Sequence, residues 1–267
     1  MIIRVDEFNK PELQVYTKYN ENQLKHIYEP DRGLFICESV KVITRALDAG
    51  YEPESFLGEP EKLSGEAREI VEHFEKTAPV YEMEYDSLRQ LTGYALTGGI
   101  LCAMRRKELP PVEEICQNSH RVVVLEDVEN PTNIGAVFRS AAALFMDGII
   151  LTSACADPLY RRAARVSMGT VFQIPWTITD SVPFKELRNC GFQTVAMALR
   201  DDNVSIEDER LKEIPKLAII MGNEGEGLTA ETVEQSDYVA KIPMEAGIDS
   251  LNVAAASAVA FWELGKR

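Results

Sequence analysis

Short apolar runs alternate with amphipathic segments along the whole chain. The runs predict strands at residues 34–37, 55–57, 80–83, 100–104, 122–125, 148–151, 172–176, 194–198, 217–221 and 238–242. Between them, apolar residues at helical spacing predict helices at 9–28, 38–50, 64–76, 86–91, 135–145, 160–166 and 184–189, with a last helix after residue 250. This alternation is typical of α/β proteins in which helices cover a mostly parallel sheet.

A proline-rich step divides this pattern into two parts. The stretch 109–119 begins with Leu-Pro-Pro, and because a residue before proline avoids helical geometry, we expect an extended linker there. We therefore predict a small α/β domain over residues 1–112 and a larger one over 113–267. The larger domain opens with the run VVVL at 122–125, which is typical of a central strand covered on both faces.

The C-terminal segment has the most informative local pattern. A predicted strand at 217–221 enters a turn with three glycines, and Thr229 can cap the helix that follows. Strand, glycines and helix also describe a nucleotide-phosphate loop. However, Glu224 and Glu226 lie inside this turn and no lysine follows the glycines, which argues against a bound diphosphate.

Composition and charge disfavour several classes of protein. The chain has 28 Lys+Arg against 43 Asp+Glu, and its net charge of −15 argues against a protein that coats nucleic acid nonspecifically. Its 5 scattered cysteines and 3 separated histidines form no zinc-ligand pattern, so we expect reduced thiols and no metal. An uninterrupted apolar run of about 18 residues and a signal peptide are both missing, and we expect a cytoplasmic protein without a membrane span.

Three blocks occur in order along the second predicted domain. The first is NPTNIGAVFRSA at residues 130–141 and the second is MGNEGEGL at 221–228. The third comprises IPM at 242–244 and SLNV at 250–253. Together they resemble the motifs of the SpoU (TrmH-like) RNA 2′-O-ribose methyltransferases of the SPOUT superfamily. The resemblance implies a trefoil-knotted α/β domain with a parallel sheet, which binds S-adenosylmethionine and pairs as a homodimer.

The matched motifs also imply which residues hold the cofactor. These are Leu199, Gly222, Asn223, Gly225, Ile242, Met244 and Leu251, several of them through their backbones. Taken without the resemblance, the same positions are strand ends and packing residues.

The residues implied for the reaction are Asn133, Arg139, Glu224, Ser250 and Asn252. Arg139 matches the arginine proposed to activate the 2′-hydroxyl in this family. It acts either as a base or, since arginine is hardly deprotonated in proteins, as a clamp on the target phosphate. Asn252 also suits a helix cap. Where many family members have serine, this chain has Ala254, which removes one hydroxyl from the site.

Two groups of arginines are candidate RNA contacts: Arg105 with Arg106, and Arg161 with Arg162 and Arg165. Solvated surface charge is the alternative for each group. The first predicted domain is similar to the substrate-binding domain that precedes many SpoU catalytic domains, itself like a small ribosomal protein. Its alternative is a purely structural or dimer-supporting unit.

The sequence therefore predicts an S-adenosylmethionine-dependent 2′-O-methyltransferase acting on a structured RNA, with rRNA favoured over tRNA. Two other classes stay open. One is a non-catalytic RNA-binding or ribosome-assembly factor that retains the fold. The other is a nucleotide-binding oxidoreductase, which rests only on the glycines between residues 222 and 227.

Overall fold

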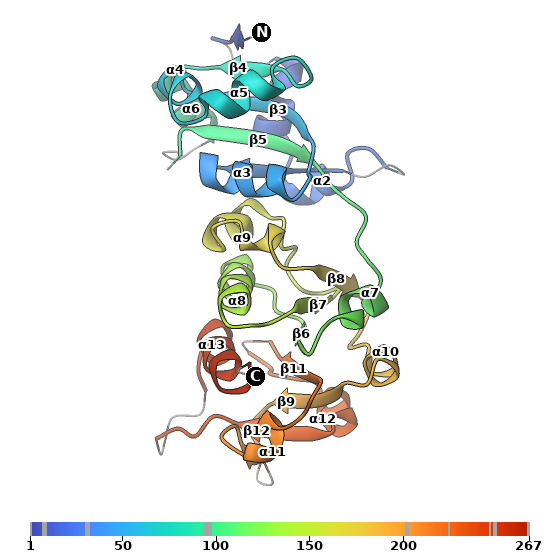
Figure 1. Cartoon of the computed structure of the whole chain (residues 1–267). Helices are drawn as coiled ribbons and strands as arrows, with labels where there is room; N and C mark the ends of the chain where they lie inside the picture. The colour runs from blue at the N-terminus through green and yellow to red at the C-terminus, as the bar shows by residue number, and fades with distance from the viewer. Residues whose placement is uncertain are drawn as a thin grey trace. The chain divides into compact units, whose positions relative to one another are not determined.

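The chain folds into two compact units, each with its own sheet (Figure 1). The computed structural model describes residues 2–265 apart from 7–9, 30–32, 93–97, 201–202, 224, 246 and 248–249. The first unit comprises Met1–Glu108 and Leu159–Phe172, and the second comprises Leu109–Pro158 and Gln173–Arg267. The domain boundary expected at residue 112 stays a prediction, since these units are defined by contacts alone. Within the described ranges, no helix is both long and apolar enough to cross a bilayer.

The first unit is built on a five-stranded sheet in the order β1-β4-β3-β5-β2. Its strands are β1 Ile2–Arg4, β2 Leu34–Glu38, β3 Pro53–Gly58, β4 Val80–Glu82 and β5 Ile100–Arg105. The sheet is mixed, because β5 runs antiparallel to β2 and β3 while β1, β3 and β4 are parallel. Its helices are η1 Pro11–Leu13, α1 Gln14–Thr17, α2 Glu21–Lys25, α3 Val40–Asp48, α4 Pro60–Ser64, α5 Arg68–Phe74, α6 Tyr85–Thr92, α9 Arg161–Val166 and η2 Thr170–Phe172.

The second unit has a seven-stranded sheet in the order β10-β12-β9-β11-β6-β7-β8, and all its strand pairs are parallel. Its strands are β6 Arg121–Leu125, β7 Gly148–Thr152, β8 Trp176–Thr179, β9 Gln193–Met197, β10 Val204–Ser205, β11 Leu217–Met221 and β12 Tyr238–Lys241. Its helices are α7 Val112–Gln117, α8 Pro131–Ala143, α10 Phe184–Asn189, α11 Glu209–Lys212, α12 Ala230–Gln235 and α13 Val253–Leu264. The predicted α/β class with a parallel sheet is confirmed.

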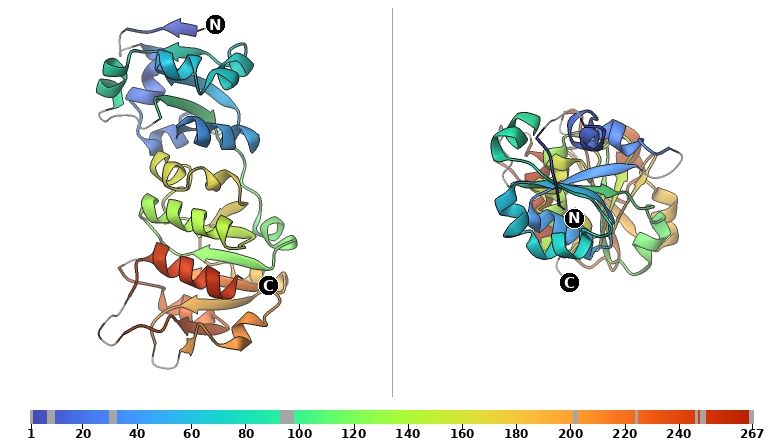
Figure 2. Two further views of the ribbon diagram at one scale, coloured as in Figure 1. Left: turned by 60° about the vertical axis from the view of Figure 1, so that its left-hand side comes forward. Right: turned by 90° about the horizontal axis from the view of Figure 1, so that it is seen from above.

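Helices cover both faces of the second sheet. On one face, Val122 and Val124 of β6 join the core beneath α7 and α10. On the other, α8 and α13 lie side by side, and their Phe138 and Phe261 are fully buried (Figures 1 and 2). Alternate residues of a strand point to opposite faces of the sheet. Because both faces are covered, consecutive residues must be apolar, as they are in the runs of β6 and β11.

Local signals explain two differences from the predicted helices. The helix expected at 9–28 is broken into η1, α1 and α2, because Asn20 and Gln23 form a capping box that starts a new helix. The helix expected at 135–145 begins earlier, at Pro131, because the Asn130 side chain accepts a hydrogen bond from the Thr132 N–H at 2.8 Å.

Two further predictions were wrong. The extended linker expected at 109–119 contains α7, whose Val112, Ile115 and Cys116 are buried. Their helical spacing indicates one apolar face, a signal hidden by the preceding prolines. The strand expected at 172–176 is displaced to β8, which starts at Trp176. Phe172 instead ends η2, where its ring lies 5.2 Å from that of Tyr51 in the first unit.

Candidate active site

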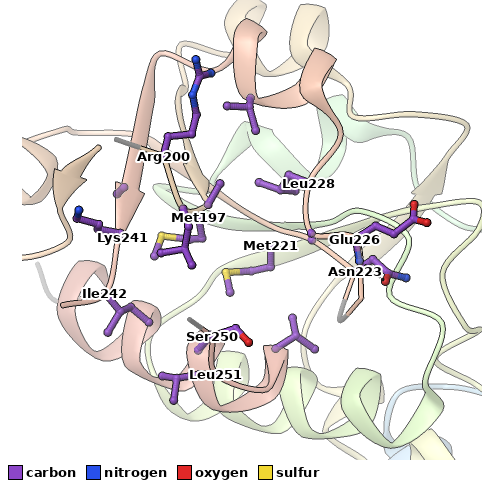
Figure 3. Close-up of a pocket in the computed structure, with 18 of the residues that line it drawn as sticks. Met197, Arg200, Met221, Asn223, Glu226, Leu228, Lys241, Ile242, Ser250 and Leu251 are labelled. Carbon is purple, nitrogen blue, oxygen red and sulfur yellow. Dashed lines mark hydrogen bonds between the residues drawn. The ribbon is translucent and has the colours of Figure 1, made fainter. Parts of the chain in front are cut away.

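A cavity of about 630 Å³ lies at the carboxyl ends of β9, β11 and β12, which meet at one edge of the second sheet because the strands are parallel (Figure 3). Segments that follow these strands supply much of its lining. They bring together all seven residues matched to the cofactor motifs, Leu199, Gly222, Asn223, Gly225, Ile242, Met244 and Leu251, and also Ser250. Which ligand these residues contact stays a prediction.

The turn after β11 is shaped by close backbone packing. A Cβ added at Gly222 would lie 2.5 Å from backbone atoms of Gly227 and Leu228, so only glycine fits there. Asn223 and Gly227 exchange backbone hydrogen bonds of 3.1 and 3.0 Å, and Gly227 has a φ of +74°. The Asn223 side chain accepts from the Gly225 N–H at 2.7 Å. The turn is therefore closed by its own hydrogen bonds.

The cavity walls combine apolar side chains with polar groups, and charged groups lie at the margin. Figure 3 shows the sulfur atoms of Met197 and Met221 near the centre, whereas the charged ends of Arg200 and Lys241 point outwards. Apolar walls combined with backbone donors and acceptors at strand ends are typical of sites for small organic ligands.

Two of the predicted reaction residues, Asn133 and Asn252, are in contact. Asn252 is the N-cap of α13, where its Oδ1 accepts from the Ala254 N–H at 3.0 Å. Its Nδ2 donates to Oδ1 of the buried Asn133 at 3.3 Å. Because Asn252 follows the cavity residue Leu251, this bond places the first turn of α8 beside the cavity.

The other predicted reaction residues are less constrained. Arg139 is exposed on α8, outside the cavity lining, and it forms no hydrogen bond or ion pair with any residue that the structure describes. Its exposed side chain can be reached from solution. Ser250 lines the cavity and is exposed. Glu224 lies outside the described residues.

Most of the candidate RNA-binding arginines have partners within the first unit. Arg105 forms a 2.6 Å ion pair with Glu54, and the Arg106 Nε donates to the Leu34 carbonyl at 3.2 Å. Arg165 lies 3.5 Å from the buried carboxylate of Glu38. The Arg161 backbone N–H donates to the Glu21 carboxylate. Arg162 is exposed and has no such partner among the described residues. These contacts leave the RNA-binding role of the group untested.

One buried charged group outside the lining of this cavity, Glu126, was not among the predicted site residues. Glu126 directly follows β6 and is only 6% exposed, although we expected residues 126–133 to form a polar loop. The available signal was an acidic residue directly after a run of apolar residues.

Within the described part of the chain, no cluster of three or more His, Cys, Asp or Glu could hold a metal ion.

Comparisons with known proteins agree with this architecture. An uncharacterized tRNA/rRNA methyltransferase of Mycobacterium bovis is 34% identical over 263 residues, covering 95% of this chain and 88% of that protein. The 23S rRNA (guanosine(2553)-2'-O)-methyltransferase RlmP of Bacillus subtilis is 29% identical over 154 residues, covering 57% of this chain and 60% of that protein.

Solved structures share the fold over nearly the full length. The AdoMet-bound rRNA methyltransferase of Sinorhizobium meliloti superposes with a TM-score of 0.82 at 24% identity, covering 98% of this chain and 97% of that one. The SpoU methyltransferase AviRb of Streptomyces viridochromogenes, in complex with AdoMet, gives a TM-score of 0.78 at 23% identity, covering 95% of each chain. The profile of the SpoU rRNA methylase family matches residues 120–262. The chain therefore belongs to the SpoU rRNA methylase family of RNA methyltransferases.

Proposed function

We propose that this chain transfers a methyl group from S-adenosylmethionine to a ribose 2′-hydroxyl of a structured RNA, with rRNA favoured over tRNA. The observation that carries the proposal is the convergence of the three motif segments. The second and third line one cavity, and the first is bonded to its edge through Asn133 and Asn252. RlmP, a relative, is a 23S rRNA 2′-O-methyltransferase by name, and the Sinorhizobium and AviRb structures contain AdoMet.

The cavity suits S-adenosylmethionine in size and in chemistry. Its volume of about 630 Å³ lies within the range of roughly 300–1,000 Å³ usual for small-molecule sites. Met221, Ile242 and Leu251 offer apolar walls for the adenine ring, and the backbones of Gly222, Ile242 and Leu251 offer polar groups to its edge. When bound, the cofactor supplies an electrophilic methyl group on a positively charged sulfur.

Arg139 would hold the target nucleotide rather than remove its proton. Arginine stays protonated in proteins, but its planar guanidinium binds a phosphate bidentately. Such a clamp fixes the ribose in line with the methyl group, while the phosphate or a water molecule takes the proton. Asn133, Ser250 and Asn252 would orient the ribose by neutral hydrogen bonds. For Glu224 we propose a role in orienting the nucleotide or Arg139, on the sequence motif alone.

A homodimer through the exposed face of α8 and α13 is part of the proposal. Val259 and Trp262 of α13 are 41% and 54% exposed, and Phe145, just after α8, is 62% exposed. Exposed large apolar side chains, two of them three residues apart on α13, are typical of an interaction surface. Closed twofold pairing of identical surfaces is the commonest way to cover such a face.

The C-terminal trefoil knot is proposed with the same family pattern. Its support is that residues on both sides of the 242–251 segment line the cavity together with the turns after β9 and β11. The alanine-rich α13 then packs closely against α8 and β11. Small side chains permit that close approach.

RNA binding is assigned to the first domain, residues 1–112, with Arg161, Arg162 and Arg165. Among these arginines, exposed Arg162 is the strongest candidate, because it has no ion-pair partner among the described residues. A cytoplasmic location follows from the RNA substrate. Arg105 and Arg165 already form ion pairs with acidic residues, so RNA binding would rely on local contacts. The net charge of −15 agrees with this.

Calorimetric titration with S-adenosylmethionine, with S-adenosylhomocysteine and NAD as comparators, tests the cofactor. We expect saturable binding of the two sulfur nucleotides near one per subunit and no binding of NAD. Methyl-labelled cofactor and total rRNA or tRNA then test the reaction, with nuclease digestion to identify 2′-O-methylated nucleosides. Cofactor binding without any labelled RNA would favour a different substrate. RNA binding without cofactor binding would favour the non-catalytic assembly factor.

A further inference from the structure

A buried carboxylate just before the first motif is bonded to the helix that follows the turn of the second. Glu126, directly after β6, accepts a hydrogen bond from the Thr229 N–H at 2.9 Å. It also accepts from the hydroxyl groups of Thr229 at 3.0 Å and Thr232 at 2.5 Å. Thr229 is the N-cap of α12 and directly follows the glycine turn at residues 222–228. The carboxylate therefore holds the far end of that turn.

The next residue holds the near end of the same turn. The Asp127 carbonyl accepts from Asn223 Nδ2 at 2.8 Å. Asp127 has a backbone φ of +56°, which residues other than glycine rarely adopt, and its conformation is held by Thr152. The Thr152 hydroxyl accepts from the Asp127 N–H at 3.0 Å and donates to its carboxylate at 2.6 Å. Glu126 and Asp127 are therefore hydrogen-bonded to opposite ends of the turn at residues 222–228.

These residues lead directly into α8. Pro131, four residues after Asp127, starts the helix that presents Asn133 and Arg139. Hydrogen bonds to a charged acceptor are stronger than those between neutral groups, and a buried polar group that loses its partner is destabilising. The 222–228 turn, which lines the cavity, is therefore tied to the base of the helix that carries the proposed phosphate clamp.

We propose that Glu126 is a positioning residue for the methyl transfer. Through Thr229 and Thr232 it holds the cofactor-side turn at a set position relative to α8, and so relative to Arg139. This inference rests on the proposed function for its catalytic meaning. The competing explanation is that Glu126 only caps α12, in which case its loss would lower stability and leave the cavity unchanged.

The substitution Glu126→Gln tests the proposal with little change in shape. Its amide nitrogen replaces one acceptor oxygen, and every group facing that carboxylate is a donor. Glu231→Gln is the matched control. Glu231 is exposed on α12, the helix whose N-terminus Glu126 contacts, and it bonds only Gln235, at 2.9 Å, among the contacts described. If Glu126→Gln does not fold, Thr232→Val removes a single donor and takes its place.

Hydrogen exchange of the free protein gives the first readout. We expect faster exchange of the amides at 222–229 and at the start of α8 in Glu126→Gln, and none of this in Glu231→Gln. The second readout is the Kd for S-adenosylmethionine at a temperature where circular dichroism shows every variant folded. It should rise roughly tenfold for Glu126→Gln and stay within about twofold for the control. The kcat for RNA methylation should fall as well, with KM for RNA little changed.

Adding Thr232→Val to Glu126→Gln should change the Kd and the kcat little further, because both substitutions remove the same interaction. Unchanged exchange, Kd and kcat in a Glu126→Gln protein of lowered Tm would overturn the proposal in favour of a plain cap. If the wild-type protein does not bind S-adenosylmethionine, the proposed function fails instead. The exchange experiment still decides whether Glu126 holds the turn against α8.

Discussion

The side chains of Asn133 and Asn252 are hydrogen-bonded to each other, although 119 residues separate them in sequence. The bond joins the first turn of α8 to the N-terminus of α13. Asn252 uses its two polar atoms for different purposes, since Oδ1 caps α13 and Nδ2 reaches Asn133. One residue therefore both starts the last helix and ties it to the first motif.

Substitutions at Asn252 should separate these two tasks. Asn252→Ala removes both, and loss of the cap should lower the free energy of unfolding by about 1 kcal/mol in denaturant titrations. Asn252→Ser keeps a capping hydroxyl but is too short to reach Asn133, so stability should be nearly retained. Both variants should lose methyl transfer to a similar degree. Full activity in Asn252→Ser would show that the link to Asn133 is dispensable.

Gly222→Ala should destroy the cavity. Its Cβ would sit 2.5 Å from the backbone of Gly227 and Leu228, which cannot move without opening the turn. We expect at least a tenfold rise in the calorimetric Kd for S-adenosylmethionine. Gly225→Ala is the comparison, because it adds a methyl group to the same lining but its Cβ would meet only Asn223 Oδ1, at an ordinary 3.4 Å, so it should raise the Kd less. Equal affinities in the two variants would contradict the role given to Gly222.

Arg139→Ala should abolish transfer while leaving the cofactor bound. A bidentate clamp contributes two charged hydrogen bonds, so kcat/KM for RNA should fall at least about a hundredfold. The Kd for S-adenosylmethionine should not change, because Arg139 lies outside the cavity lining. Arg139→Lys should recover only part of the rate, since an ammonium cannot bind bidentately. Loss of cofactor binding together with transfer would refute the assignment.

Trp262→Glu should split the proposed dimer. A charge placed in the centre of an apolar interface must be desolvated without a partner, so we expect monomers at micromolar concentration. Light scattering after size-exclusion chromatography measures the change. Tyr85→Glu in the first unit is the control, because Tyr85 is similarly exposed, at 45%, but lies away from α8 and α13 in sequence and unit. A wild-type protein that is already monomeric would remove the dimer from the proposal.

The Cys116 thiol should make the protein less stable at alkaline pH. Burial, reinforced by neighbouring Cys190, raises the pKa of Cys116 from 9.0 to about 12. Below pH 9 the thiol is protonated in both the folded and the unfolded chain, so its contribution to stability is fully present. Between pH 9 and 12 the unfolded chain loses a proton that the folded chain keeps, and the free energy of unfolding therefore falls.

Cys116→Ala should flatten that alkaline decline in urea titrations performed across the same pH range. The comparison with wild type cancels the other groups that titrate there. Parallel pH profiles for the two proteins would mean that the thiol is not shielded as the fold implies.

Much of the second unit could be predicted from sequence because its signals are local. The run 122–125 of β6 and the whole of β11 are apolar and buried, and their helices follow at the expected spacing. The glycines after β11 and the cap at Thr229 are also local requirements of the backbone. The eight cavity-lining residues among the predicted site residues were named from the family resemblance, and they lie at or after strand ends.

Local patterns were insufficient where two signals competed. The prolines before α7 hid its apolar face, and the capping box at Asn20 divided what looked like one helix. Phe172 belongs to an aromatic cluster with Phe35 and Tyr51 instead of a strand. A cap at Asn20 and a distant contact at Phe172 overrode the periodicity of their segments, whereas at α7 the periodicity was correct and the prolines were misleading.

By itself, the sequence determined the α/β class, the central strands and the family motifs, because apolar periodicity and backbone turn chemistry depend on neighbouring residues. Only the tertiary structure decided that Asn133 meets Asn252, that Glu126 is buried against Thr229 and Thr232, and that Arg105 and Arg165 already have acidic partners. Such pairings depend on which distant segments each unit brings together. That arrangement comes from the packing of the whole unit, and no short stretch of the chain encodes it.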